Sequence, residues 1–235
     1  MNLLRLSLLF LLLLPACVAR PPSAIPPDLL TRAAPNTTNQ LLLVLGTGQS
    51  HFTTAWLLER NNPAAPWRTA RGPMPSVVGA RGFAPPNQKR EGDRRTPTGS
   101  FTITETFGTE PHAPSRLPYR LLADRDAWCE DPASPNYNQW ITVDERDATT
   151  DRLKRDDNLY RITAVIDYNR NPIIPGHGSA IFMHLADPTR PSGAGTLGCV
   201  GLNNTDLQAV IAALDPAKRP MILMGRPADL TAPPR

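Results

Sequence analysis

Short apolar or alternating segments, separated by proline, glycine and asparagine, dominate the middle of this chain. Segments of this length and spacing predict β-strands. The expected strands cover residues 41–45, 53–59, 76–78, 100–104, 119–122, 140–143, 160–168, 180–185 and 220–224.

One segment near the C-terminus has helical periodicity instead. Apolar residues recur there at spacings of three and four, at Leu207, Val210, Ile211 and Leu214. Either Asn204 or Thr205 is placed to cap a helix over residues 206–214. Many short strands and one late helix predict a mainly β domain, a β-sandwich or barrel with a few helices. A doubly wound parallel sheet would need several more amphipathic helices.

The first 19 residues predict export. They contain one arginine, an apolar run over residues 6–14 and then small residues, which is the layout of a secretory signal. The run is shorter than the ~20 residues of a membrane span. Leu-Pro-Ala-Cys at residues 14–17 resembles a bacterial lipobox, which would place a lipid on Cys17; cleavage after Ala19 is the alternative. Both routes predict a periplasmic protein of the cell envelope. Only the lipobox route gives it a membrane anchor, on Cys17.

Composition sets the expected domain boundaries. Residues 20–39 carry five prolines and predict an extended linker, and residues 226–235 predict a loose tail. Residues 40–225 are then expected to form one globular domain, and the chain is 40% hydrophobic, enough for a core. The net charge of +4 is spread among interleaved acids, which argues against a nucleic-acid-binding surface.

Candidate chemistry is concentrated near Cys199. A run of small and turn-forming residues precedes this cysteine, and His184 follows the apolar residues 180–183. A cysteine at the end of such a loop has backbone amides beside its sulfur, which suits a nucleophile with an oxyanion pocket. A thiol with an ordinary pKa near ~8.5 needs a base, and His184 is the candidate. From the residues alone, Cys199 and His184 could equally be two buried side chains without a catalytic role.

Four motifs that follow one another along the chain narrow this choice. They are Lys-Arg-Glu-Gly-Asp at 89–93 with Thr-Pro-Thr-Gly at 96–99, Trp-Cys-Glu-Asp-Pro at 128–132 with Tyr-Asn at 137–138, Gly-Ser-Ala-Ile-Phe-Met-His at 178–184, and Thr-Leu-Gly-Cys-Val at 196–200. In these motifs the sequence resembles a divergent branch of the L,D-transpeptidase catalytic domain family (YkuD-like). The resemblance extends from about residue 41 to 224.

The resemblance implies an enzyme that acts on peptidoglycan stem peptides without a metal or organic cofactor. Cys199 would attack the third residue of a stem tetrapeptide and expel the terminal D-Ala, and an amine of a second stem would resolve the thioester. His184 would be the general acid and base, the amides of Gly198 and Cys199 would hold the oxyanion, and Thr196 would orient the loop. Further substrate-binding candidates are Arg90, Asp93, Tyr137, Asn138, Ser179 and Arg190.

Two departures from the family pattern keep other functions open. Leu197 stands where most of the wider family has a second histidine, and Gly201 where many members have an arginine, for which Arg190 or Arg90 could substitute. An L,D-carboxypeptidase or other hydrolase, or an inactive wall-binding protein, are therefore alternatives. In an oxidising compartment, Cys129 could also pair with Cys199 in a disulfide.

Overall fold

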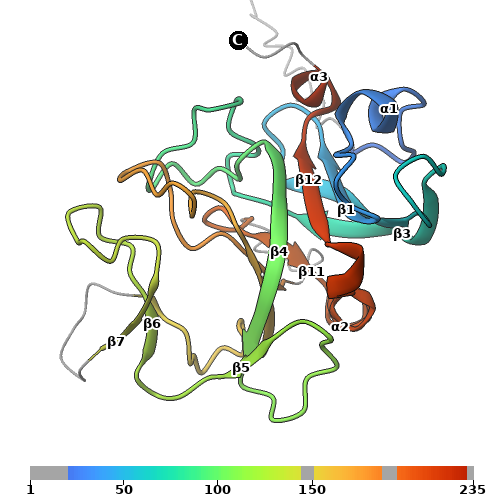
Figure 1. Ribbon diagram of the computed structural model, residues 1–235. Helices are drawn as coiled ribbons and strands as arrows, with labels where there is room; N and C mark the ends of the chain where they lie inside the picture. The colour runs from blue at the N-terminus through green and yellow to red at the C-terminus, as the bar shows by residue number, and fades with distance from the viewer. Residues whose placement is uncertain (1–20, 144–150, 187–194, 232–235) are drawn as a thin grey trace, which may run out of the picture.

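The computed structural model describes residues 21–143, 151–186 and 195–231 (Figure 1). Strands dominate these residues, as predicted. The strands are β1 (Gln40–Gly46), β2 (Phe52–Glu59), β3 (Arg68–Val77), β4 (Gly99–Gly108), β5 (Tyr119–Leu121), β6 (Asp126–Trp128), β7 (Trp140–Thr142), β8 (Asp151–Arg152), β9 (Ile162–Ile166), β10 (Phe182–Leu185), β11 (Val200–Leu202) and β12 (Met221–Gly225). The helices are α1 (Leu29–Ala33), α2 (Asn204–Ala213), the 3₁₀ helix η1 (Pro216–Lys218) and α3 (Pro227–Leu230).

The larger of two sheets closes on itself. Within the described residues its nine strands run in the order β12-β1-β2-β3-β11-β10-β9-β4-β5, and β12 also pairs with β4. This second pairing completes a ring, with β5 attached beside it on β4. The architecture is therefore a barrel rather than a sandwich, and closure removes open edges from the ring. The smaller sheet has the order β7-β6-β8.

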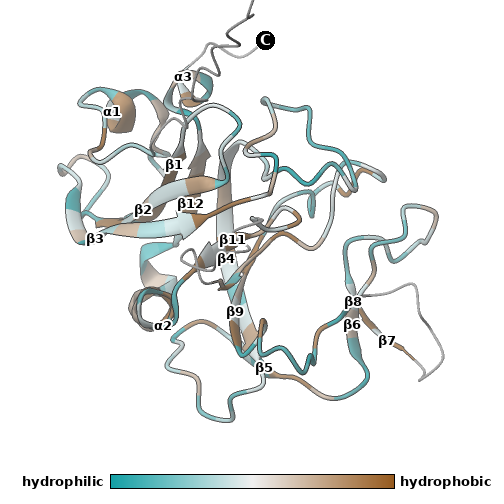
Figure 2. Cartoon of the chain, turned by 180° about the vertical axis from the view of Figure 1, so that it is seen from behind, coloured by the Kyte–Doolittle hydropathy of each residue, from teal (hydrophilic) through white to brown (hydrophobic). Residues whose placement is uncertain are grey.

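Strand β1 is buried on both of its faces, which explains its unbroken apolar sequence. Leu42 and Val44 belong to the main core, together with the apolar face of α2. Leu41, Leu43 and Leu45 belong to a second cluster on the opposite face of the strand. Apolar colour along the barrel strands can be followed in Figure 2.

The second cluster is covered by both ends of the described chain. Leu29 of α1 is 1% exposed there, and Leu230 of α3 packs against the same cluster. Part of the segment expected to be an extended linker is thus folded onto the barrel. Leu29 and the neighbouring Ile25 bury apolar surface, which offsets the extended preference of the prolines around them.

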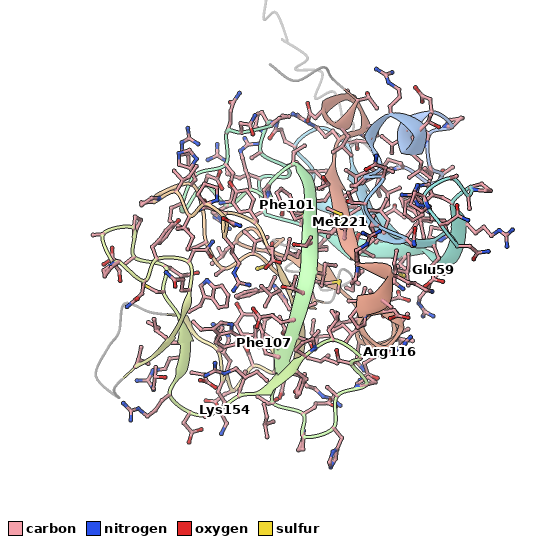
Figure 3. The ribbon with its side chains drawn as sticks, viewed as in Figure 1. Glu59, Phe101, Phe107, Arg116, Lys154 and Met221 are labelled. Carbon is pink, nitrogen blue, oxygen red and sulfur yellow. The ribbon has the colours of Figure 1, made fainter. Side chains whose placement is uncertain are left out.

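A third cluster lies between the barrel and the smaller sheet. Phe107 of β4 makes edge contacts with Trp140, Tyr160 and Phe182, at ring-centroid distances of 5.1, 5.8 and 5.2 Å. Its position beside β4, on the side of β6 and β7, can be followed in Figure 3. Cys199 belongs to this cluster, so the smaller sheet covers the part of the barrel that carries it.

Several elements differ from the sequence prediction. Strands β6, β8 and β11 were not predicted, because segments of two or three residues carry too little pattern. Strand β3 begins at Arg68 although it contains a glycine and two prolines, and register shifts between β2 and β3 accommodate this irregular sequence. The cap of α2 is Asn203, not Asn204 or Thr205, since its side chain accepts a hydrogen bond from the Asp206 amide.

Candidate active site

Cys199 lies directly before β11, and its sulfur is held between two backbone groups of the chain that leads into β10. The Phe182 amide donates to Sγ at 3.3 Å, and the thiol donates to the Ala180 carbonyl oxygen at 3.2 Å. An amide directed at sulfur favours the thiolate, and a carbonyl oxygen favours the thiol. The residue is 8% exposed, so water reaches little of it.

His184 lies on β10 and is almost fully buried. Its Nδ1 is 2.9 Å from the Leu185 carbonyl oxygen. Because a carbonyl oxygen only accepts, Nδ1 carries the hydrogen in this contact and Nε2 is left as the basic nitrogen. The ring of Tyr160 meets the imidazole edge-on at 5.6 Å.

Burial keeps His184 neutral. Desolvation lowers its pKa from 6.5 to about 4, while the hydrogen bond to Leu185 opposes this shift. Arg155 lowers and Asp157 raises the same pKa, which places this ion pair within electrostatic reach of the ring. At neutral pH His184 is therefore a proton acceptor rather than a cation.

Strand register brings the two side chains to one face of the barrel. Strands β10 and β11 are parallel, with Met183 opposite Val200 and His184 opposite Gly201. The same register places Cys199 opposite Phe182, two residues before His184. Side chains two residues apart on a strand share a face, so Cys199 and His184 lie on the same side.

The loop before Cys199 is fixed by two threonines. Thr196 Oγ1 donates to the Cys199 carbonyl oxygen at 2.6 Å and accepts from the Gly198 amide at 3.1 Å. Thr96 Oγ1 donates to the Gly198 carbonyl oxygen at 2.7 Å and accepts from the Gly79 amide at 2.8 Å. The loop-orienting role expected for Thr196 fits this geometry. Thr96 was missed as a site residue, although its Thr-Pro-Thr-Gly motif was visible.

Asn138 supports the other side of the sulfur. Its Oδ1 accepts from the Ala180 amide at 3.0 Å and from Trp128 Nε1 at 2.9 Å. Its Nδ2 donates to the Tyr168 and Asn169 carbonyl oxygens at 3.1 and 2.8 Å. Ala180 itself has a φ of +50°, a conformation that costs energy for a residue with a Cβ. The left-handed residue also explains why the strand expected from residue 180 begins only at Phe182.

Tyr137 and Ser179 are joined through Glu91. Both hydroxyls donate to Glu91 Oε2, Ser179 at 2.7 Å, and the Gly178 amide donates to the Tyr137 hydroxyl at 3.1 Å. Burial raises the pKa of Tyr137, and the Glu91 carboxylate raises it further. These substrate-binding candidates, like Asn138, make their hydrogen bonds inside the protein and hold the chain before β10.

The remaining substrate-binding candidates differ in how far they are exposed to solvent. Asp93 accepts from the buried Lys89 ammonium at 2.8 Å, whereas Arg90 is exposed. Arg190 lies outside the described residues.

The two departures from the family pattern have clear structural settings. Leu197 is 77% exposed. A Cβ on Gly201 would overlap Ala186 Cβ and lie 2.7 Å from Val77 Cγ2, so this position has no space for a side chain.

Cys129 and Cys199 are both present as buried thiols. In the described part of the chain, no group of three metal-ligating side chains could hold a metal ion. None of the helices seen there is long and apolar enough to cross a membrane.

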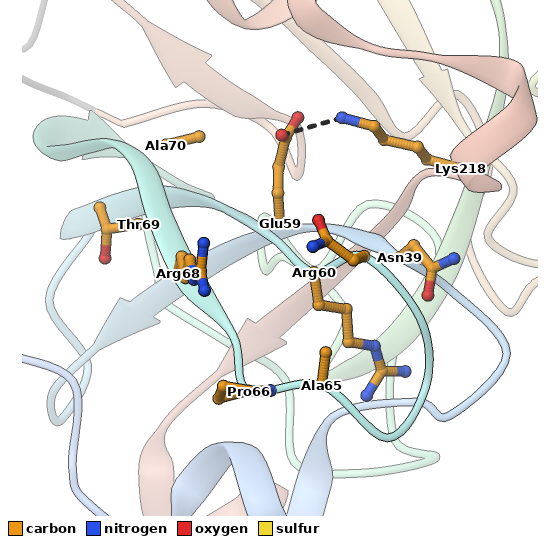
Figure 4. A pocket seen from close by; sticks show the side chains of 10 residues that line it. Asn39, Glu59, Arg60, Ala65, Pro66, Arg68, Thr69, Ala70 and Lys218 are labelled. Atoms are coloured by element: carbon orange, nitrogen blue, oxygen red, sulfur yellow. Dashed lines mark hydrogen bonds and ion pairs between the residues drawn. The ribbon is translucent and has the colours of Figure 1, made fainter.

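A hollow of about 430 Å³ lies elsewhere, between β2, the start of β3 and η1 (Figure 4). Its lining includes Arg60, Arg68 and the ion pair of Glu59 with Lys218 at 2.9 Å, and none of the site residues above.

The structure thus places a buried cysteine and a buried histidine on one side of a β-barrel, and the comparisons with known proteins identify the family of this domain. The family model of the L,D-transpeptidase catalytic domain (YkuD) matches residues 48–223. This chain belongs to that family, which confirms the resemblance. A solved structure from Bdellovibrio bacteriovorus, that of Bd1075, is similar with 15% identity and a TM-score of 0.40. The match covers 82% of this chain and 50% of that one, so this chain spans half the length of that protein. No curated protein matches the sequence.

Proposed function

We propose that this protein is an L,D-transpeptidase that joins stem peptides of peptidoglycan through a thioester on Cys199. One observation carries the proposal: a thiol held by a backbone amide lies on the same barrel face as a neutral, buried histidine. Family membership supplies the substrate class. The proposal requires no chemistry beyond these two side chains and the surrounding amides.

The acylation step moves one proton through His184. Nε2 accepts the thiol proton of Cys199 as sulfur bonds to the carbonyl carbon of the third stem residue. The tetrahedral intermediate then collapses, the bond to the terminal D-Ala breaks, and Nε2 returns the proton to the leaving amine. Because Nδ1 stays bonded to Leu185, the ring keeps its orientation during both transfers.

The second step repeats this path in reverse. The amine of a second stem attacks the thioester carbon, His184 accepts the amine proton, and the thiolate leaves and is reprotonated. The protein thereby exchanges one amide bond for another, with no net consumption of water.

The oxyanion of both intermediates needs donors beside Cys199. We assign this role to the amides of Gly198 and Cys199. Since the Gly198 amide donates to Thr196 Oγ1 in the structure, it must exchange that bond for one to the substrate oxygen. Thr196→Val would remove the competing acceptor and also the bond that holds the Cys199 carbonyl.

A defined disaccharide tetrapeptide tests the proposal, with products identified by mass spectrometry. A dimer that lacks one D-Ala indicates transpeptidation, whereas a tripeptide formed with uptake of water indicates an L,D-carboxypeptidase. Cys199→Ala and His184→Asn are expected to form neither product; the asparagine amide can still donate to the Leu185 carbonyl and so serves as the matched variant. Dimers formed by Cys199→Ala, or no product with the wild-type protein, would contradict the proposal.

We further propose that the protein works in the periplasm, where its substrate lies. The signal-like residues 1–19 support export, and Cys17 would supply a lipid anchor if it is acylated. Metabolic labelling with a fatty-acid analogue, compared between the wild type and Cys17→Ser, separates lipidation from cleavage after Ala19.

A further inference from the structure

The segment of residues 79–96 forms one wall beside the catalytic loop. Backbone hydrogen bonds join Thr196 to this segment and to the residue before it. The Ala80 amide donates to the Thr196 carbonyl oxygen at 2.8 Å, and the Thr196 amide donates to the Val78 carbonyl oxygen at 2.9 Å. A Cβ on Gly198 would lie 3.1 Å from the Arg95 carbonyl oxygen. The wall and the loop that carries Cys199 are therefore in direct contact.

This segment is rich in charge, and its acids face inward. Residues 81–95 contain five basic and two acidic side chains. Glu91 accepts from the hydroxyls of Tyr137 and Ser179. Asp93 accepts from Lys89 Nζ at 2.8 Å and from the Arg90 and Arg95 amides, both at 2.9 Å. Neither carboxylate forms an ion pair with an exposed arginine of the segment.

Three arginines of the segment remain exposed: Arg81, Arg90 and Arg94, which we call the arginine rim. Within the described ranges, none of them forms an ion pair with a carboxylate, although most other exposed basic residues do. Arg90 donates to the Lys89 carbonyl oxygen at 2.7 Å, and no side-chain hydrogen bond of Arg81 or Arg94 is found there. Positive charge is thus concentrated beside the catalytic loop, in a segment that is largely hydrophilic in Figure 2.

We propose that the arginine rim binds carboxylates of the stem peptide and so determines which peptides reach Cys199. This inference rests on the proposed function. A stem tetrapeptide presents several carboxylates, including that of its terminal D-Ala, and a guanidinium matches a carboxylate in both charge and geometry. Gly201 has no space for a side chain, and among the described residues the rim is a group of exposed basic side chains in a segment hydrogen-bonded to the catalytic loop.

Binding of the tetrapeptide, measured by calorimetry in the Cys199→Ala background, tests the rim without any turnover. Arg90→Gln/Arg94→Gln removes two of its charges. Arg68→Gln/Arg219→Gln removes two charges of arginines that are also exposed but lie outside the segment, and Arg68 lines the hollow of Figure 4. At low ionic strength the rim variant is expected to raise the Kd about fivefold, as for two partly screened charges, and the control variant to leave it unchanged.

Further binding measurements identify the cause of a change in Kd. A tetrapeptide with amidated carboxylates should bind the Cys199→Ala protein and its rim variant equally weakly. For the free-acid tetrapeptide, added salt should remove most of the difference in Kd between these two proteins. Equal Kd values for the free-acid tetrapeptide in the Cys199→Ala protein, the rim variant and the control variant would overturn the binding role of the rim. The proposed function would be unaffected. If the tetrapeptide bound to none of these proteins, both the role of the rim and the proposed function would be overturned. Rim-dependent binding to phosphatidylglycerol vesicles, with peptide binding unchanged, would instead assign the rim to a membrane surface.

Discussion

At the residue scale, the account depends on the state of His184. The imidazole is buried, and its Nδ1 hydrogen is directed at the Leu185 carbonyl, so the basic nitrogen is defined before substrate arrives. A preformed thiolate–imidazolium pair would require a charged histidine in this apolar position, which desolvation opposes. We therefore expect proton transfer to accompany attack of the sulfur rather than precede it.

This protonation state predicts the acid limb of the pH profile. Activity requires neutral His184, and its pKa is lowered to about 4 against an ordinary 6.5. As the pH falls, kcat/KM should stay near its plateau through pH 6 and decline only as the lowered pKa is approached. Stopped assays with the tetrapeptide between pH 4 and 8 measure this. An acid limb centred near 6.5 would mean that the histidine is exposed to water in the working enzyme.

Asn138 is a positioning residue, and its removal should affect turnover more than binding. Asn138→Ala releases the Ala180 amide and leaves several buried groups without partners, at a cost of about 1–3 kcal/mol. Because the Ala180 carbonyl accepts from the thiol, the sulfur then loses its fixed direction. We expect kcat to fall at least about tenfold with little change in KM.

Trp128→Phe is the matched control for Asn138→Ala. It removes one donor to the same oxygen but keeps the bond between Asn138 and Ala180. The pH dependence of Cys199 alkylation by iodoacetamide, read from the mass of its peptide, should change in Asn138→Ala and not in Trp128→Phe. If the pH dependence of alkylation were the same in the two variants, Asn138 would have only a structural role.

The sequence was enough to propose Cys199 and His184 as reactive residues, but not to predict the contacts of the residues around them. Cys199 and His184 stand out because their chemistry is readable from residue type and motif. The inward direction of Glu91 and Asp93 is not readable, since their interleaving with arginines looks like a balanced surface. The left-handed Ala180 was also hidden, because nothing in an alanine predicts a positive φ.

At the element scale, β11 is packed too closely for any side chain at Gly201. An added Cβ would overlap Ala186, so Gly201→Ala should destabilise the protein by about 1–3 kcal/mol. Ala186→Gly removes one of the two obstacles and should recover part of this loss in the double variant. Denaturant titration of the four proteins measures the coupling. Additive effects would show that the strand simply shifts to make room.

The helix α1 gives a second prediction at this scale. Leu29 is 1% exposed in the cluster beneath α1 and α3, so Leu29→Ala should cost about 2–4 kcal/mol of unfolding free energy. Asp28→Ala, which removes only an exposed ion pair with Arg32, should cost less than about 1 kcal/mol. Equal, small effects in thermal unfolding would mean that the segment acts as a linker after all.

Elements with a clear apolar pattern were predicted from the sequence, including the short strands β5 and β7, whereas most of β3 and the short strands β6, β8 and β11 were not. Strands β1, β2 and β12 and helix α2 lie close to their predicted ranges because each presents a continuous or periodic apolar face, whereas β4 continues four residues beyond the predicted end at residue 104. Strand β3 was largely missed because it is formed by pairing with β2 rather than by its own propensity. The helix α1 was missed because a proline-rich composition concealed one well-placed leucine.

At the scale of the whole molecule, Cys199 belongs to the cluster between the barrel and the smaller sheet. The aromatic side chains of Phe107, Trp128, Tyr160 and Phe182 pack in the same region, and Tyr160 contacts His184. This arrangement keeps water from His184 and leaves the charged wall of residues 79–96 as the polar border of the candidate site. Ring closure through β12 and β4 could not be read from the sequence, because it joins strands far apart in the chain.

The most direct test of the central claim is the intact mass of the protein after brief exposure to the tetrapeptide substrate. The account predicts a covalent adduct with the mass of the acyl portion without its D-Ala, located on Cys199 by peptide mapping. The adduct should be absent from Cys199→Ala and disappear when an amine acceptor is added. An adduct on another residue, or turnover that continues in Cys199→Ala, would contradict a thioester mechanism.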